Sequence, residues 1–307
     1  SPNGLGYARI PGLFNDAQMR GWKAVTGAVH AEGGRIFAQL MHTGRVTHVA
    51  NLPAGAEVVG PTAEPCPGEM YTDAKGMQPH SAPRAMTERD IQHAVGEYAQ
   101  AARPAIHPGF DGIELHAANG YLIEQFLNAN VNKRADGYGG SIANRNRFAL
   151  EVARAVATAI GAERVGIRLS PFGAFNSTGT YPDQAEQYLA LAREISSLGL
   201  FYLHVLDHSA MGAPAVPAAH TAKLRAALKG VSLLAGGLDG ASAERALAEN
   251  RADLIAFGKP FLANPDLLDR LRKGAPLNAP DCSTFYTPGA KGYTDYPKLA
   301  EVEGVTP

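Results

Sequence analysis

Residues 110–127 read FDGIELHAANGYLIEQFL, and this stretch decides how the rest of the chain is interpreted. Its short apolar run, residues 113–117, leads directly into a turn of polar and small residues. A run of this length bounded by turn residues predicts a buried strand, because strands covered on both faces are apolar nearly throughout. The question is then whether similar runs recur along the chain.

Five further apolar runs lie on either side of this stretch, at residues 35–41, 165–170, 201–206, 231–237 and 253–258. Helical stretches separate them and are expected to begin near Thr87, Ser141, Pro182, His220 and Ala241, and after Pro265. An earlier helix is expected from Asn15 to about His30, with Gln18 completing a capping box. Strand alternating with helix predicts an α/β fold with a parallel sheet covered by helices.

The fold class that these runs favour is a (β/α)8 TIM barrel. A closed barrel needs eight strands, whereas six are counted and the chain opens on a helix, so the first two strands are expected to be absent from this chain. We expect residues 1–307 to form a single barrel domain. Residues 42–85, rich in Gly, Pro and polar side chains, are longer than ordinary connections and predict an irregular excursion or lid after a barrel strand.

The amino-acid composition and net charge limit the classes of function that this protein can have. The chain of 307 residues is 45% hydrophobic and 19% charged with a net charge of −1, which is typical of a globular protein and disfavours nucleic-acid and anionic-membrane partners. Cys66 and Cys282 fit no CxxC pattern, so no metal site or disulfide framework is expected. A reducing cytoplasm is the expected location. No apolar stretch reaches transmembrane length.

Polar side chains crowd the end of the strand at residues 113–117, where barrels place their ligand contacts. His116 and Asn119 can both donate hydrogen bonds to one substrate oxygen and stabilise charge that develops there. Tyr121 can act as an acid, since a phenol with an ordinary pKa of about 10 stays protonated near neutrality. Alternatively, His116 satisfies a buried backbone group and Tyr121 packs at the barrel rim.

Two groups of residues on the predicted strands and at their ends suggest a binding site for a cofactor that has a phosphate group and an aromatic ring system. Gly236, Gly237 and Gly258 follow the last two strands, and Lys259 adds a positive charge, as expected at the usual phosphate site of barrels, although such glycines also form turns. Gln39 and Arg168 are polar residues inside apolar strands, which is unfavourable unless each has a partner. A flavin ring is one such partner, and a structural ion pair is the alternative for Arg168.

The chain resembles the Old Yellow Enzymes, FMN-dependent ene-reductases such as N-ethylmaleimide reductase and the xenobiotic reductases. The resemblance rests on five blocks in family order, which together span nearly the whole chain. They are FAQLMHTGR from Phe37, FDGIELHAANGYLIEQFL from Phe110, NKRADGYGGSIANRNRF from Asn132, FGKPFLANPDLL from Phe257 and FYTPGAKGYTDYP from Phe285.

The resemblance implies NAD(P)H-dependent reduction of activated carbon–carbon double bonds in enones, enals, maleimides and nitroalkenes, through bound FMN. By position, His116 and Asn119 would hold the substrate oxygen, and Tyr121 would donate the proton. The cofactor would be bound by Gln39, Arg168, Gly236, Gly237, Gly258, Lys259 and Phe285. Met41, where relatives often have Trp, and Tyr286 would line the substrate pocket.

Three alternatives are weighed against this interpretation. A dienoyl-CoA reductase relative needs cysteines for an iron–sulfur cluster, which this chain lacks. A Rossmann dehydrogenase is disfavoured because no GxGxxG motif follows a strand. A flavin-free barrel fragment that acts as a binding or assembly module stays open, and the colour of the purified protein distinguishes it from a flavoprotein.

Overall fold

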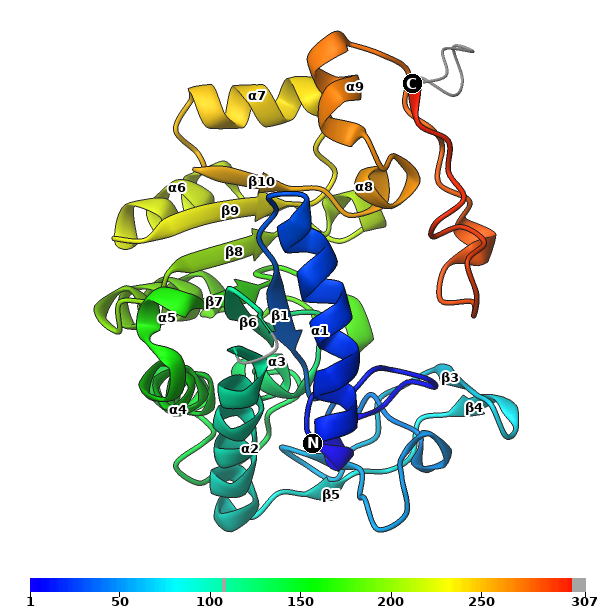
Figure 1. The fold of residues 1–307 in the computed structure, drawn as a ribbon. Helices are drawn as coiled ribbons and strands as arrows, with labels where there is room; N and C mark the ends of the chain where they lie inside the picture. The colour runs from blue at the N-terminus through cyan, green and yellow to red at the C-terminus, as the bar shows by residue number, and fades with distance from the viewer. Residues whose placement is uncertain (107–108, 300–307) are drawn as a thin grey trace. The chain divides into compact units, whose positions relative to one another are not determined.

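A computed structural model describes residues 1–106 and 109–299 of the chain (Figure 1). The chain divides into two compact units. The first, called the sheet unit, comprises residues 1–237 and 251–254, and the second, called the C-terminal unit, comprises residues 238–250 and the chain from residue 255 on.

A parallel sheet forms the centre of the sheet unit. Its strands run in the order β1 (Phe37–Leu40), β6 (Gly112–Ala117), β7 (Val165–Leu169), β8 (Tyr202–Leu206) and β9 (Val231–Ala235). Each strand pairs in parallel with the next. A further strand, β10 (Leu254–Ala256), lies in the sixth apolar run. The structure therefore confirms all six predicted strands and the α/β class of the fold.

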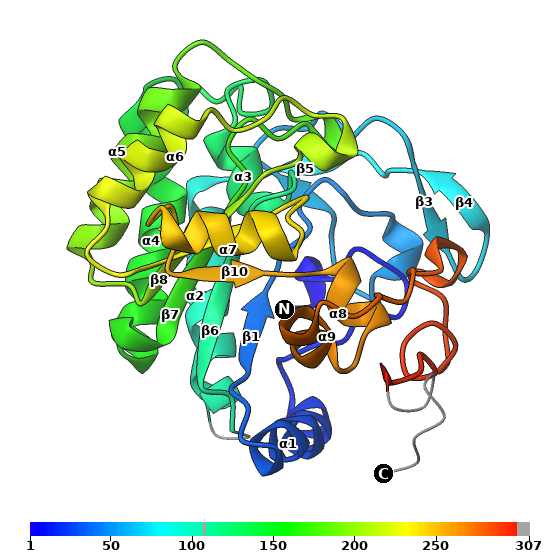
Figure 2. The same cartoon turned by 90° about the horizontal axis from the view of Figure 1, so that it is seen from above.

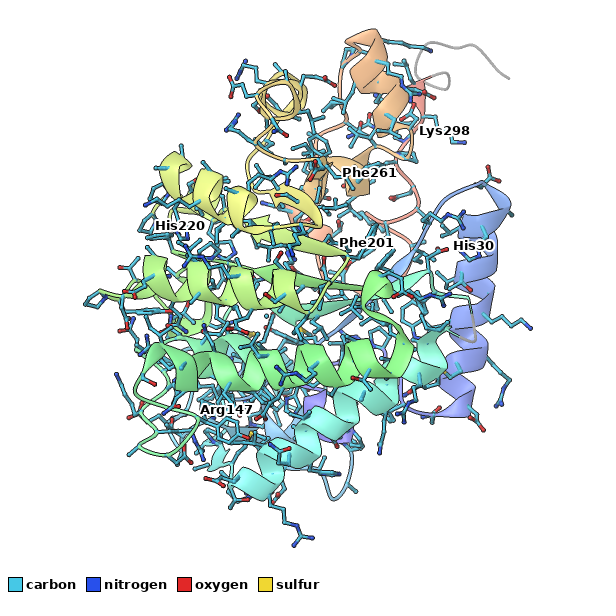
Figure 3. The ribbon with its side chains drawn as sticks, turned by 90° about the vertical axis from the view of Figure 1, so that its left-hand side faces the viewer. His30, Arg147, Phe201, His220, Phe261 and Lys298 are labelled. Carbon is cyan, nitrogen blue, oxygen red and sulfur yellow. The ribbon has the colours of Figure 1, made fainter. Side chains whose placement is uncertain are left out.

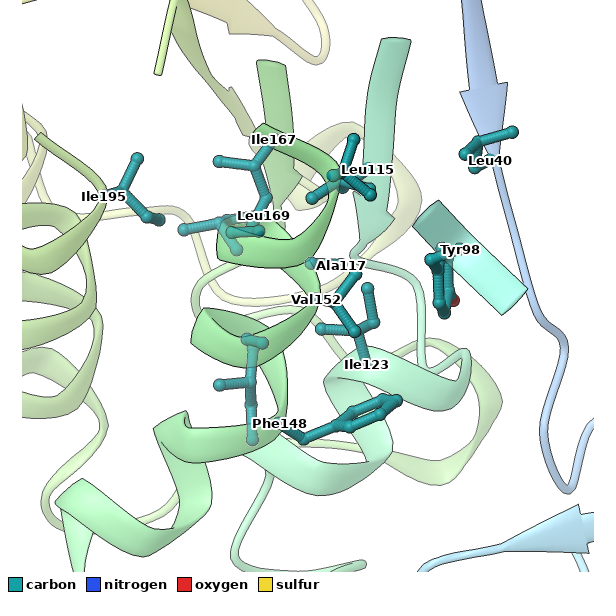
Figure 4. Packing of buried hydrophobic residues seen from close by; sticks show 14 of the residues in the cluster. Leu40, Tyr98, Leu115, Ala117, Ile123, Phe148, Val152, Ile167, Leu169 and Ile195 are labelled. Atoms are coloured by element: carbon teal, nitrogen blue, oxygen red, sulfur yellow. The ribbon is translucent and has the colours of Figure 1, made fainter. Parts of the chain in front are cut away.

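Helices cover one face of this sheet. They are α2 (Glu88–Ile106), α4 (Ile142–Ile160), α5 (Gln184–Ser197) and α6 (Ala218–Ala227) (Figures 2 and 3). The core lies between the two layers, where Leu115, Ile167 and Leu169 of the strands pack with Val152 and Ile195 of the helices (Figure 4). These strand residues are odd-numbered, because alternate side chains of a strand point to opposite faces.

The other face of the sheet, formed by even-numbered residues of β6, β7 and β8 and by odd-numbered residues of β1, carries several polar side chains. His116 of β6 is in register with Arg168 of β7, and Arg168 with His204 of β8. Gln39 of β1 is in register with Glu114 of β6. The expectation that the strands are apolar throughout was therefore wrong. Polar and apolar residues alternate in β6, whereas Ser232 is the one polar residue of β9.

Local signals predicted most helix starts. Asn15 caps α1 (Asp16–Ala31) with Gln18 in a complete capping box, and Ser141 caps α4. Helix α5 begins two residues after Pro182, and α6 begins two residues before His220. Helix α3 (Leu122–Leu127), directly after the polar turn, was not predicted. Single-turn helices are η1 (Pro2–Gly4), η3 (Ala162–Arg164), η4 (Phe175–Ser177) and η5 (Ser209–Met211).

Residues 42–85 contain more regular structure than expected. They include the helical turn η2 (Val49–Asn51) and four short strands, β2 (Val59–Gly60), β3 (Glu69–Thr72), β4 (Gly76–Pro79) and β5 (Arg84–Ala85). Strands β2 and β5 pair in parallel, while β3 and β4 form an antiparallel pair. The excursion is thus built from two small sheets rather than from irregular chain alone.

The C-terminal unit contains α7 (Gly240–Ala248), α8 (Lys259–Ala263), α9 (Leu267–Lys273) and the turn η6 (Cys282–Thr284). Arg270 holds it together, since this almost fully buried side chain bonds Asp266 and the carbonyl oxygens of Pro276 and Pro297. Within the described part of the chain, no helix is long and apolar enough to cross a membrane. Cys66 and Cys282 are free thiols.

Candidate active site

His116 lies at the end of β6 and is 3% exposed. Its Nδ1 accepts a hydrogen bond from the backbone N–H of Ala118 at 3.3 Å. Burial, with the nearby charge of Arg168, lowers the pKa of His116 to about 3, so the ring is neutral near pH 7. An Nδ1 that accepts leaves the hydrogen on Nε2, and no described residue accepts from it. His116 thus satisfies a backbone group, as the alternative held, and keeps one donor unused.

The polar turn after β6 is held in a left-handed conformation, with φ of +60° at Asn119 and +72° at Gly120. The backbone N–H of Asn119 donates to Oγ of Ser170 at 2.9 Å, and its carbonyl oxygen accepts from the Asn176 amide at 2.7 Å. The side-chain Oδ1 of Asn119 lies 2.9 Å from Nε2 of His208. Among the residues described, none accepts a hydrogen bond from the Asn119 amide nitrogen.

A buried carboxyl supports this turn from below. Glu124 of α3 accepts the backbone N–H of Gly120 at 2.6 Å, the Ser170 hydroxyl at 2.9 Å and the Tyr188 hydroxyl at 3.1 Å. Burial raises the pKa of Glu124 to about 7, although the three hydrogen bonds oppose the shift. Because Ser170 also bonds Asn119, the Glu124 carboxyl fixes both residues of the turn.

Tyr121 stands beside His116, with ring centroids 4.9 Å apart and the rings nearly perpendicular. Its hydroxyl lies 2.9 Å from the hydroxyl of Tyr7. The structure therefore brings His116, Asn119 and Tyr121 together at the end of one strand, as predicted. Tyr7 was not predicted, because 114 residues separate it from Tyr121.

Gln39 belongs to a network centred on Glu114. Its amide nitrogen donates to one carboxylate oxygen of Glu114 at 2.5 Å. The other oxygen is 2.8 Å from Nδ1 of His204 and accepts from the Tyr202 hydroxyl at 3.0 Å. Burial favours a higher pKa for Glu114, but hydrogen bonds and the charge of His204 outweigh it and lower the pKa to about 2. The carboxylate is ionised near neutrality, and the Gln39 amide oxygen stays available to a ligand.

Arg168 has no protein partner of this kind. Its Nε is buried without a hydrogen bond, and within residues 1–106 and 109–299 no carboxylate forms an ion pair with it. Nε2 of the neighbouring His204 is also buried and unpaired. Burial lowers the pKa of Arg168, while Glu114 opposes that shift. The alternative of a structural ion pair for Arg168 therefore has no support in the described residues.

Two consecutive glycines follow β9 in left-handed conformations, Gly236 with φ of +109° and Gly237 with φ of +66°. A Cβ at Gly236 would overlap the carbonyl oxygen of Asp207, at 1.9 Å. Turn geometry alone thus requires the glycine at position 236, and successive backbone N–H groups in a turn can bind an anion.

Four predicted site residues belong to the C-terminal unit. Gly258 precedes α8, and Lys259, an exposed residue, is its first residue. A Cβ at Gly258 would meet no atom within 4 Å. Phe285 ends η6 and packs edge-on against Tyr286 with centroids 6.5 Å apart, and Tyr286 is 92% exposed.

A cavity of about 380 Å³ lies beside β1 in the sheet unit. Gln39 and Met41 line it together with Trp22 of α1 and Tyr98 of α2. Met41 lines this cavity, and its place in a substrate pocket stays a prediction. Met41 lies on the same side of the chain as Gln39, because side chains two positions apart in an extended segment point in the same direction.

Glu114, His204 and His208 are further polar residues of this site that were not predicted from the sequence. The first two interrupt apolar strand runs, as Gln39 and Arg168 do, so the same criterion applied to every strand would have found them. His208 follows β8 by two residues, in the position where strand ends carry ligand contacts.

The profile of the NADH:flavin oxidoreductase / NADH oxidase family matches residues 1–278. The chain belongs to this family, that of the Old Yellow Enzymes. It is therefore a flavin oxidoreductase, and FMN is the cofactor of the family. This membership favours the enzyme over the flavin-free module considered above.

Curated relatives match almost the whole chain. Chanoclavine-I aldehyde reductase of Penicillium roqueforti is 43% identical over 307 residues, which cover 97% of this chain and 80% of the relative. 12-Oxophytodienoate reductase 2 of Arabidopsis thaliana is 40% identical over 303 residues, with coverage of 97% and 80%. A probable flavin mononucleotide-dependent alkene reductase of Leishmania infantum is 43% identical over 299 residues, with coverage of 95% and 80%.

Solved structures agree with these relatives. Morphinone reductase superposes with a TM-score of 0.94 at 44% identity, covering 98% of this chain and 82% of that structure. Morphinone reductase in complex with tetrahydroNAD gives a TM-score of 0.92 at 45% identity, with coverage of 97% and 82%. A nicotinamide dinucleotide is thus the hydride donor expected in this family.

The polar groups of the sheet unit fit an FMN molecule. Two buried nitrogens, Nε of Arg168 and Nε2 of His204, lack partners among the described residues, which is unfavourable in the absence of a ligand. Among the residues described, no three His, Cys, Asp or Glu side chains gather in a way that would hold a metal ion. These two unpaired nitrogens therefore match an organic cofactor that carries hydrogen-bonding groups.

Proposed function

We propose that this protein reduces the activated carbon–carbon double bond of small-molecule enones, enals, maleimides and nitroalkenes with NADPH or NADH. The observation that carries the proposal is the pair of unused donors after β6, Nε2–H of His116 and the amide of Asn119, next to the Tyr121 phenol. FMN, when bound, supplies the hydride. The protein groups bind, polarise and protonate the substrate.

His116 and Asn119 donate to the carbonyl or nitro oxygen of the substrate. A neutral imidazole suits this role, because its Nε2–H polarises the oxygen without a full positive charge that would have to be buried. The negative charge that develops on the oxygen in the transition state strengthens both hydrogen bonds. The lowered pKa of His116 therefore serves binding through a neutral donor rather than proton transfer.

Tyr121 donates its hydroxyl proton to the α-carbon. Its ring lies against His116, so a substrate oxygen held by His116 places the adjacent carbons near the phenol. The Tyr7 hydroxyl, 2.9 Å from that of Tyr121, can orient it and relay a proton from solvent. Met41 and Tyr286 are proposed to line the substrate pocket.

We propose that seven residues bind the FMN cofactor. Gln39 would bond the pyrimidine edge of the ring with its unused amide oxygen, and Arg168 would stabilise the negative charge of the reduced ring. The phosphate would be bound by Gly236, Gly237, Gly258 and Lys259, with Phe285 closing over the ring. The left-handed turn at Gly236 and Gly237 supports this assignment, because successive N–H groups in a turn can bind an anion.

We also propose a complete fold class and a cellular location for this protein. The sheet is proposed to be part of a (β/α)8 barrel, with residues 1–307 as a single domain and residues 42–85 as its lid. The close superposition on morphinone reductase supports the barrel. A net charge of −1 and two free thiols support a cytoplasmic enzyme without nucleic-acid or membrane partners.

Stopped-flow spectroscopy of the flavin tests the proposal. The purified protein should be yellow, NADPH should bleach the visible flavin absorption, and 2-cyclohexen-1-one should restore it. Tyr121→Phe should preserve bleaching by NADPH and slow the recovery with the enone by at least about 100-fold, the scale of one general acid. A preparation that stays colourless after addition of FMN would overturn the proposed function, and unchanged recovery in Tyr121→Phe would overturn the role of Tyr121.

A further inference from the structure

His208 contacts the Asn119 amide from the loop that follows β8. Its Nε2 lies 2.9 Å from Oδ1 of Asn119, and the residue is 2% exposed. The two residues come from loops 89 positions apart in the sequence. The contact is therefore a specific product of the fold rather than of local chain geometry.

The chemistry of the two groups fixes the direction of this hydrogen bond. A side-chain carbonyl oxygen only accepts, so His208 donates from Nε2 and its Nδ1 carries a lone pair. Nδ1 of His208 is buried and has no hydrogen-bond partner among the described residues, which is unfavourable. The contact from Nε2 to Asn119 is therefore formed despite this cost. With Oδ1 engaged, the two N–H groups of the Asn119 amide are the ones left to a ligand.

The surroundings hold the imidazole in place. Its ring lies 5.0 Å from the ring of Phe175, and a Cβ at Gly173 would come within 2.7 Å of Nδ1. The loop is anchored because Asp207 accepts the backbone N–H groups of Ser209 at 2.7 Å and Val216 at 3.0 Å. The histidine thus has little freedom to leave Asn119.

We propose that His208 is a positioning residue, which fixes the Asn119 side chain so that its amide N–H groups, and not its oxygen, meet the oxygen of the substrate. An asparagine amide rotated by half a turn would present its carbonyl oxygen and repel an activated carbonyl or nitro group. His208 selects the productive orientation without touching the substrate. This inference rests on the proposed function, in which Asn119 binds the substrate oxygen.

Two substitutions separate hydrogen bonding from packing. His208→Phe keeps a ring against Phe175 but removes the donor, whereas His208→Gln keeps an N–H donor that can reach Oδ1 of Asn119. We expect the rate of flavin reoxidation by 2-cyclohexen-1-one to fall about tenfold in His208→Phe, the scale of one lost hydrogen bond. In His208→Gln it should stay within about threefold of the unchanged protein, because the donor is retained.

The same stopped-flow traces give a second readout. The dependence of the observed rate on enone concentration yields the dissociation constant and the limiting rate separately. We expect the loss in His208→Phe to appear in both, since the Asn119 hydrogen bond forms with the bound substrate and strengthens in the transition state. Bound FMN and the far-UV circular dichroism spectrum report whether each variant is folded.

A double-mutant cycle with Asn119→Ala completes the test. If His208 acts only through Asn119, His208→Phe should change the rate by less than about twofold in the Asn119→Ala background. An equal loss in both backgrounds, or failure of His208→Gln to recover activity while folded, would overturn the inference. A normal rate in Asn119→Ala alone would instead overturn the proposed role of Asn119, so the two failures are distinguishable.

Discussion

The backbone N–H of Gly120 donates to the carboxyl of Glu124 at 2.6 Å, in a fully buried site where the pKa of Glu124 rises to about 7. One side chain thus links the stability of the protein to the geometry of the turn that carries Asn119 and Tyr121. Because a buried carboxyl favours its protonated form, the link depends on pH.

The first prediction concerns this pH dependence. The pKa of Glu124 is raised from 4.5 to about 7 in the folded protein, so its contribution to stability is full below pH 4.5 and is lost as the pH rises through 7. Glu124→Gln cannot titrate and should abolish this loss, which is on the order of 3 kcal/mol. Urea unfolding of both proteins at pH 5 and pH 8 measures it.

The comparison between the two proteins is the decisive quantity, since other groups titrate as well. The unfolding free energy of the unchanged protein should fall, relative to Glu124→Gln, between pH 5 and pH 8. A constant difference between the two proteins across this range would show that Glu124 titrates normally. Tyr188→Phe, which removes only one of the bonds to Glu124, serves as the matched control for packing.

The second prediction concerns stability in acid, where the contribution of Glu114 changes with pH in the opposite direction to that of Glu124. The pKa of Glu114 is lowered from 4.5 to about 2, so its stabilising contribution is present above pH 4.5 and is lost as the pH falls towards 2. Glu114→Gln should therefore be less stable at pH 6 by up to about 3 kcal/mol, and the difference should vanish near pH 2. Thermal unfolding at a series of pH values measures it, and a difference that persists at the lowest pH contradicts the assignment.

The third prediction concerns Arg168, whose buried Nε has no partner in the sheet unit. Arg168→Met removes a half-buried charge whose buried Nε is unpaired, and it should stabilise the FMN-free protein by about 1 kcal/mol. The same change should weaken FMN binding at least about tenfold, because a charge-assisted hydrogen bond to the cofactor is lost. Opposite signs in urea unfolding of the FMN-free protein and in fluorescence titration with FMN identify a ligand-binding residue, whereas destabilisation without a change in FMN affinity would identify a structural one.

The sequence predicted the strands well because each is a short apolar run between turn residues, and it predicted the starts of α1 and α4 because Asn15 and Ser141 cap them. It also placed His116, Asn119 and Tyr121 together, since all three lie at or just after the end of one strand. It did not predict the polar face, because the alternation of Glu114 and His116 with Leu115 was taken for a uniformly apolar run.

Contacts between segments that are far apart in the chain could not be predicted from the sequence. The approach of Tyr7 to Tyr121 and of His208 to Asn119 depends on how loops fold over the sheet, and no local pattern encodes it. The two small sheets within residues 42–85 were missed for a related reason. Strands of two to four residues are too short to show a period, and pairing across the excursion stabilises them.

The fourth prediction separates a glycine required by the turn from one proposed to contact phosphate. A Cβ at Gly236 would overlap the backbone of Asp207, and its φ is +109°, so Gly236→Ala should destabilise the protein by about 3 kcal/mol or more. Gly258 has a negative φ of −93° and open space around it, so Gly258→Ala should change stability by less than about 1 kcal/mol.

FMN titration of these two variants completes the comparison. Gly258→Ala should weaken FMN binding several-fold despite its normal stability, because a methyl group would stand where a phosphate oxygen is proposed to approach the backbone. Gly258→Ser, with a somewhat larger side chain, should weaken binding at least as much. Unchanged FMN affinity in both Gly258 variants would remove this residue from the phosphate site, and an undiminished unfolding free energy in Gly236→Ala would mean that the turn after β9 accommodates a side chain.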